Sequence, residues 1–182
     1  VLQEKYNKQD MTLKELYDIN PILLTVKCIN ITNGCNEYIN VRTDPDISIL
    51  TLLQMTTAIP IFFKPVEYNK CHYVDGGLTG GYPTELVKSN YLGFNIHGEL
   101  KQSEPSLLDT IPFIKYMVSL LKINTSDYSN LPKENTINYY TNIHFTDFSI
   151  PLDKKKELIE LGYTKTKEHI LKYKIINENI HH

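Results

Sequence analysis

Residues 73–83 read YVDGGLTGGYP, and four of the eight glycines in this 182-residue chain fall within six positions of that stretch. The apolar residues ahead of the loop predict a β-strand that delivers Asp75 into it. Glycine lets the backbone of such a loop take dihedral angles that other residues disfavour. A carboxylate presented in this way suits a catalytic base, a metal ligand or a tight structural turn, and the spacing alone does not choose among them.

The sequence on either side of this loop predicts a mixed series of strands and helices. Asn33-Gly34 predicts the turn of a β-hairpin, and Asn69-Lys70 separates two further expected strands. Asp46 is the expected N-cap of a helix that stops at Ile59-Pro60. The expected strands cover residues 22–31, 36–42, 66–68, 71–74, 92–96 and 137–145. The expected helices cover residues 12–18, 47–59 and 106–123. A further helix is expected to have its first turn at Pro83, and the final helix to begin near Leu152. Such a mixture predicts an α/β layer structure.

The composition is that of a globular protein, with 41% hydrophobic and 22% charged residues. Nineteen Lys and Arg against 21 Asp and Glu give a net charge of −2, so no nucleic-acid partner is expected. The apolar runs are shorter than the roughly 18 residues of a membrane-spanning helix, and we expect no signal peptide. The expected helix 106–123 is apolar on more than one face, which indicates packing between the core and a partner surface, or a lipid-facing lid.

Three cysteines, Cys28, Cys35 and Cys71, are an odd number in a chain of this size and predict reduced thiols in a cytosol-like compartment. A zinc site that adds His72 lacks a close C-x-x-C pair, so no metal is expected there. Ala58 is the only alanine while Asn, Ile, Lys and Tyr are abundant, which indicates the A/T-rich coding of some viruses and intracellular parasites. The terminal His181-His182 is either native or a purification tag, and carries no functional argument.

The loop also contains a second pattern, because residues 77–81 read G-x-T-x-G between a strand and a helix, the setting of a nucleophile elbow. Thr79 would then be the nucleophile, with His97 or His144 as its partner. We disfavour this hypothesis because a threonine hydroxyl is bulky and needs a strong base, and because Asp75 already accounts for the loop.

The order of motifs resembles the second half of the patatin-like phospholipase domain. The resemblance rests on residues 12–17 (TLKELY), a β-hairpin, residues 57–66 (TAIPIFFKPV), residues 73–77 (YVDGG), and in the tail residues 148–152 (FSIPL) and 158–163 (LIELGY). It spans Met11 to about Leu171. It implies an α/β fold of the patatin-like kind, a three-layer structure with a sheet covered by helices, of which this chain is the C-terminal portion. Residues 1–10 would be the tail of an upstream segment, and residues 11–182 the C-terminal part of one patatin-like domain.

The resemblance implies a lipid acyl hydrolase of the phospholipase A type that uses a Ser–Asp dyad. Asp75 would be the catalytic aspartate, and Gly76 and Gly77 would turn the backbone so that its carboxylate projects toward the serine. The serine of G-x-S-x-G and the oxyanion hole would lie upstream, since no G-x-S-x-G occurs in these 182 residues. The family often has Ala-Ser where this chain has Thr56-Thr57, and asparagine where it has Gly80-Gly81.

The same resemblance sets the expected partners. These are a lipid ester substrate, the upstream half of the same domain and a peripheral membrane contact. The expected location is the cytoplasm of a host or parasite cell. No cofactor and no metal are expected. The chain alone is expected to be inactive. The alternative hypothesis is a catalytically inactive patatin-like remnant that acts as a protein- or membrane-binding module.

Overall fold

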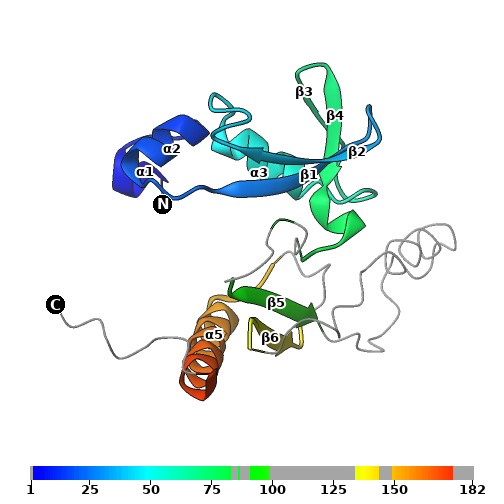
Figure 1. Cartoon of the computed structure of the whole chain (residues 1–182). Coiled ribbons are helices and arrows are strands. Elements are labelled where there is room, and N and C mark those ends of the chain that lie inside the picture. The colour runs from blue at the N-terminus through cyan, green and yellow to red at the C-terminus, as the bar shows by residue number, and fades with distance from the viewer. Residues whose placement is uncertain (1, 83–85, 87–90, 99–133, 144–148, 174–182) are drawn as a thin grey trace, which may run out of the picture. The chain divides into compact units, whose positions relative to one another are not determined.

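The structure is a computed structural model that describes residues 2–82, 86, 91–98, 134–143 and 149–173 (Figure 1). The described residues fall into two compact units, one formed by residues 2–82 and one by the remainder, and each is described by itself. The helices expected at Pro83 and over residues 106–123 lie outside the described residues, as does the end of the strand expected over residues 137–145.

The first unit is built on a four-stranded sheet whose order is β2-β1-β4-β3, with every neighbouring pair antiparallel (Figure 1). Its elements in chain order are α1 (Leu2–Tyr6), α2 (Leu13–Ile19), β1 (Thr25–Asn30), β2 (Cys35–Asn40), α3 (Ile49–Thr56), β3 (Val66–Tyr68), β4 (Cys71–Asp75) and the single 3-10 turn η1 (Gly76–Thr79).

The hairpin predicted around Asn33-Gly34 is confirmed, and the strands expected on either side of Asn69-Lys70 form a second hairpin. β1 pairs with β2 around a turn that contains Gly34 at φ 66°, in the left-handed region that favours glycine. β3 pairs with β4 around Asn69 and Lys70, whose φ angles are 48° and 64°. Two successive residues with positive φ are typical of a type I′ turn, which matches the twist of antiparallel strands.

The start of α3 differs from the prediction. Its N-cap is Ser48 rather than Asp46, and the Ser48 hydroxyl oxygen accepts a hydrogen bond from the Thr51 N–H at 3.1 Å. The Ser48 hydroxyl in turn donates to the carboxylate of Asp10, which also accepts the N–H of Leu50 at 3.2 Å. Asp10 therefore ties the segment expected to be a tail to the first turn of α3. That segment also contains α1, which the sequence did not predict.

The core of the first unit lies where α3 packs on β1 and β4, and Leu13 at the start of α2 adds to it. Within α3, Leu52 and Met55 are almost completely buried, whereas Leu53 is 48% exposed. The spacing of the buried positions is that of a helix with one apolar face. The core cluster consists of Met11, Leu13, Cys28, Ile39, Ile47, Ile49, Leu52, Met55 and Tyr73.

The neighbouring leucines of α3 give a matched test of this packing. We expect Leu52→Ala to lower the free energy of unfolding by about 2–5 kcal/mol, because it removes buried contacts and leaves a cavity. Leu53→Ala changes the same residue type in the same helix but should cost within about 0.5 kcal/mol. Urea denaturation followed by circular dichroism measures both. Equal effects of the two substitutions would contradict this placement of the core.

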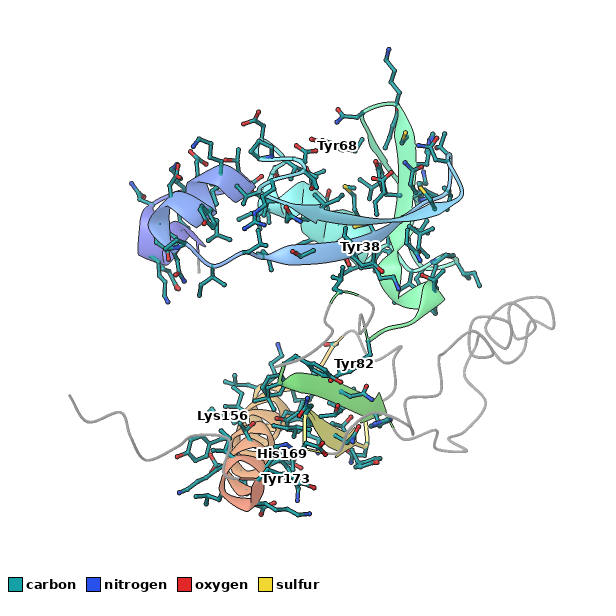
Figure 2. The ribbon with its side chains drawn as sticks, viewed as in Figure 1. Tyr38, Tyr68, Tyr82, Lys156, His169 and Tyr173 are labelled. Atoms are coloured by element: carbon teal, nitrogen blue, oxygen red, sulfur yellow. The ribbon has the colours of Figure 1, made fainter. Side chains whose placement is uncertain are left out.

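The second unit pairs a two-stranded parallel sheet with a long helix. Strands β5 (Gly93–Gly98) and β6 (Thr136–Thr141) run parallel, and α5 (Leu152–Tyr173) contacts β6. The hydroxyls of Tyr139 and Thr166 share a hydrogen bond of 2.7 Å between β6 and α5. His169 and Tyr173, one turn apart on α5, bring their ring centroids to 4.7 Å (Figure 2). The strands and helix expected in this region are confirmed within the described residues.

None of the helices that the structure describes has both the length and the apolar character needed to cross a membrane.

Candidate functional site

Asp75 lies where β4 ends and η1 begins. It is the last residue of the strand and the N-cap of the 3-10 turn. Its N–H donates to the carbonyl oxygen of Ala58, just beyond α3, at 3.2 Å. Its partner across the sheet is Cys28 of β1. The backbone of Asp75 is thus fixed by both a neighbouring strand and the end of a helix.

The carboxylate of Asp75 is held by its own loop. Its Oδ1 atom accepts a hydrogen bond from the N–H of Gly77 at 2.7 Å. The surrounding protein only partly buries the side chain, and this burial raises the pKa of Asp75 above its ordinary value of 3.8, while the Gly77 N–H acts in the opposite direction. A half-buried carboxylate with a raised pKa is a better proton acceptor than an exposed one.

Gly76 is required by a close approach of the backbone and not by an unusual dihedral angle. A Cβ atom at this position would lie 2.2 Å from the carbonyl oxygen of Lys27 and 2.6 Å from its carbonyl carbon. Among the described glycines, positive φ occurs at Gly34 and Gly80 and not at Gly76 or Gly77. The unusual backbone dihedral angle that was expected at residues 76–77 occurs instead at Gly80, where φ is 117°.

Lys27 also contacts the far end of η1. Its ammonium group donates to the carbonyl oxygens of Gly80 at 3.2 Å and of Thr79 at 3.4 Å. A cation at the C-terminal end of a helical turn stabilises the carbonyl groups that have no partner within the turn. The Asp-Gly-Gly loop thus lies against one residue of β1, which contacts the loop at its start and at its end.

The Thr79 hydroxyl has a partner that fits a structural role. It donates to Oδ1 of Asn36 on β2 at 2.8 Å. His97 bonds to Oδ1 of Asn138 at 2.9 Å in the second unit, and His144 lies outside the described residues. Asp75, Gly76 and Gly77 lie at the junction of β4 and η1, and the structure gives the Thr79 hypothesis no support.

Cys28 lies beside Asp75 and is completely buried. Burial is the main cause that raises the pKa of its thiol to about 12. The hydrogen bond with Thr56 lowers this pKa, whereas the negative charges of Asp75 and Glu37 raise it further. All three cysteines are free, with Cys35 exposed and Cys71 intermediate. Within the described part of the chain, no three His, Cys, Asp or Glu side chains gather in a way that could hold a metal ion.

The cysteines should differ in reactivity because only a thiolate is alkylated readily. At pH 8 we expect iodoacetamide to modify Cys35 in the folded protein and to leave Cys28 unmodified, since Cys28 is both inaccessible and protonated. In 8 M urea both should react. Peptide mass spectrometry measures the modified fractions, and modification of native Cys28 at the rate of Cys35 would contradict this environment.

A polar network on the face of the sheet that carries Cys28 and Asp75 was not predicted from the sequence. Asn30, 1% exposed, donates to Oε1 of Glu37 at 2.8 Å, and the Tyr73 hydroxyl donates to Oε2 of Glu37 at 3.0 Å. The strand register places this network next to Cys28 and Asp75. Its one detectable signal is the polar Asn30 between Ile29 and Ile31 at the end of an expected strand. The network fixes three strands to one another beside the candidate base.

Comparison with known proteins finds a family match over the part of the chain that contains this site. Residues 5–88 match the family described as patatin-like phospholipase, a range that includes Asp75, Gly76 and Gly77. The protein named "Probable lipid hydrolase 463L" from Invertebrate iridescent virus 6 is 33% identical over 79 residues, which are 43% of this chain and 27% of the relative. The match thus spans about a quarter of that relative's length. The expected resemblance and α/β fold class are confirmed, and the likeness of the tail beyond residue 88 stays a prediction.

Proposed function

On the premise that residues 5–88 of this chain are patatin-like, we propose that it supplies the aspartate half of a lipid acyl hydrolase active site. The observation that carries the proposal is the geometry of Asp75. Its half-buried carboxylate stands at the end of a central strand, held by the Gly77 N–H at 2.7 Å, within the segment that matches the family. A lipid hydrolase named among the relatives supports the same class of reaction.

In the proposed reaction, Asp75 accepts the proton of a serine hydroxyl as the serine oxygen bonds to the ester carbonyl carbon. The ester C–O bond then breaks, and Asp75 returns the proton to the departing alcohol. Water attacks the acyl-serine in the same way and releases the fatty acid. The pKa of Asp75, raised by burial, favours these proton transfers. No cofactor takes part in these steps.

The serine and the oxyanion donors would come from a segment outside these 182 residues, because no G-x-S-x-G occurs in them. We therefore propose a longer protein in which an upstream half completes the domain, and in which this chain alone is inactive. The substrate would be a lipid ester met at a membrane surface by peripheral contact, in the cytoplasm of a host or parasite cell. The near-balanced charge supports no nucleic-acid partner.

The coding sequence that precedes Val1 tests this proposal at once. A G-x-S-x-G ahead of Val1 supports the enzyme, whereas a start codon near Met11 supports the inactive remnant. The longer protein is then assayed for fatty acid released from phospholipid vesicles, with a variant in which the serine of that motif is alanine as the control. Release that depends on this serine supports the enzyme, and equal release by both proteins contradicts it.

A further inference from the structure

The end of α3 contacts β4, which leads into the Asp-Gly-Gly loop, and also the neighbouring strand β1. The hydroxyl of Thr56, the last residue of the helix, donates to the carbonyl oxygen of Lys27 on β1 at 2.8 Å. Two residues later, the carbonyl oxygen of Ala58 accepts the N–H of Asp75 on β4 at 3.2 Å. One helix end therefore holds β1 and β4 at the level of the candidate base.

The carbonyl group that Thr56 holds is the one against which Gly76 lies. A Cβ placed on Gly76 would lie 2.2 Å from the Lys27 oxygen, so the two backbones are in close contact and leave no space for a side chain at Gly76. Gly76 is the residue between Asp75 and Gly77, and the N–H of Gly77 orients the Asp75 carboxylate. A displacement of the Lys27 carbonyl would therefore move Gly76 and, with it, the donor that fixes the carboxylate.

We propose that Thr56 is a positioning residue for Asp75, acting through the Lys27 carbonyl and Gly76 to set the direction in which the carboxylate leaves β4. This inference rests on the proposed function. Thr56 itself touches neither the carboxylate nor the substrate in this account. The Lys27 ammonium, bonded to the carbonyl oxygens of Thr79 and Gly80, holds the other end of the same loop.

Thr57 provides the matched comparison. It has the same side chain in the next position, but its hydroxyl donates to the Leu53 carbonyl within α3 at 2.7 Å, and the residue is exposed. The loss of either hydroxyl removes one hydrogen bond from a threonine near the end of α3. Only the loss at Thr56 releases the Lys27 carbonyl, against which Gly76 lies.

The test compares Thr56→Val, Thr56→Ser and Thr57→Val with the unchanged protein. In the longer protein, Thr56→Val should lower kcat by about 10- to 100-fold with KM within about twofold, because a small misplacement of a catalytic group costs rate more than binding. Thr56→Ser keeps the hydroxyl and should restore most of the rate. Thr57→Val should leave both constants unchanged.

A second readout needs no catalysis. Carbon-13 NMR titration of the 182-residue chain follows the carboxyl carbon of Asp75. Thr56→Val should lower the pKa of Asp75 toward the ordinary aspartate value, because water admitted to the loosened loop weakens the desolvation of the carboxylate. A displaced Gly77 N–H acts in the opposite direction, but desolvation is the larger of the two causes. Thr57→Val should leave the pKa of Asp75 unchanged. Thr56→Ala also removes the hydroxyl and should shift the pKa of Asp75 in the same direction, and it tests the inference even where Thr56→Val does not fold.

The inference is overturned if Thr56→Val and Thr57→Val give the same Asp75 titration, or if Thr56→Ser loses as much rate as Thr56→Val. For Thr56→Ala, an unshifted titration overturns it as well. A longer protein that hydrolyses no ester would refute the proposed function, while the titration would still decide whether Thr56 positions the carboxylate.

Discussion

Asp75→Asn should abolish ester hydrolysis by the longer protein while leaving its fold intact. The substitution removes the group that accepts the serine proton, and general base catalysis contributes about 10²–10⁴-fold to such reactions. The asparagine side-chain oxygen can still accept the Gly77 N–H, so the loop keeps its orienting hydrogen bond. Fatty-acid release at neutral pH measures the effect, and full activity in the variant would refute the assigned role.

The stability of the same variant separates a catalytic role from a structural one. Because the pKa of Asp75 is raised in the folded state, the folded protein binds this proton more tightly than the unfolded chain does. Ionisation of Asp75 therefore lowers stability as the pH rises from the unfolded value through the folded value. At neutral pH the neutral asparagine should unfold at the same temperature as aspartate or at a higher one.

Asp18→Asn is the control for charge removal alone. Asp18 lies on α2 and forms an exposed ion pair with Lys14 at 3.4 Å, away from the loop. It should change neither hydrolysis nor, beyond about 0.5 kcal/mol, the free energy of unfolding. A loss of activity in Asp18→Asn comparable with that in Asp75→Asn would show that net charge, and not the dyad, governs the rate.

Gly76→Ala should be strongly destabilising. Its Cβ would lie 2.2 Å from the Lys27 carbonyl oxygen, which is backbone at the centre of the sheet and cannot swing aside like the end of a side chain. Forcing extra volume into a closely packed site costs about 1–3 kcal/mol or more. The same shift would separate β1 from β4 and displace Asp75, so activity should be lost together with stability.

Gly81→Ala is the matched control in the same loop. A Cβ at Gly81 meets no atom within 4 Å, and the backbone there is not in the left-handed region. This substitution should be neutral or should stabilise by about 0.4–1 kcal/mol, because alanine restricts the unfolded chain more than glycine does. Urea denaturation compares the two variants, and equal stability of Gly76→Ala and Gly81→Ala would contradict the close contact.

The fold of the first unit was predictable where local chemistry decides it. Asn33-Gly34 can form a tight turn whatever surrounds it, so the hairpin of β1 and β2 followed from the sequence. The start of α3 was misplaced because Asp46 and Ser48 are both good N-cap residues. The choice is made by Asp10, which lies 38 residues from Ser48 in the chain and binds its hydroxyl.

In the candidate site, too, the features set by neighbouring residues were predictable and those set by distant residues were not. Asp75 was recognisable because an aspartate followed by two glycines after a strand is a local pattern. The reason for Gly76 was not, since it depends on the Lys27 carbonyl of another strand. The network of Asn30, Glu37 and Tyr73 also needs the strand register, because Asn30 and Tyr73 are 43 residues apart. A single sequence does not show which residues of different strands lie opposite one another.

The pH dependence of kcat/KM in the longer protein tests the central claim most directly, because it reports the proton that the essential base must lose. The rate should rise with pH through an apparent pKa above 3.8, the ordinary value of Asp75, and this rise should disappear with the activity in Asp75→Asn. A variant that retains the same rise and the same plateau rate would contradict the assignment of Asp75 as the catalytic base.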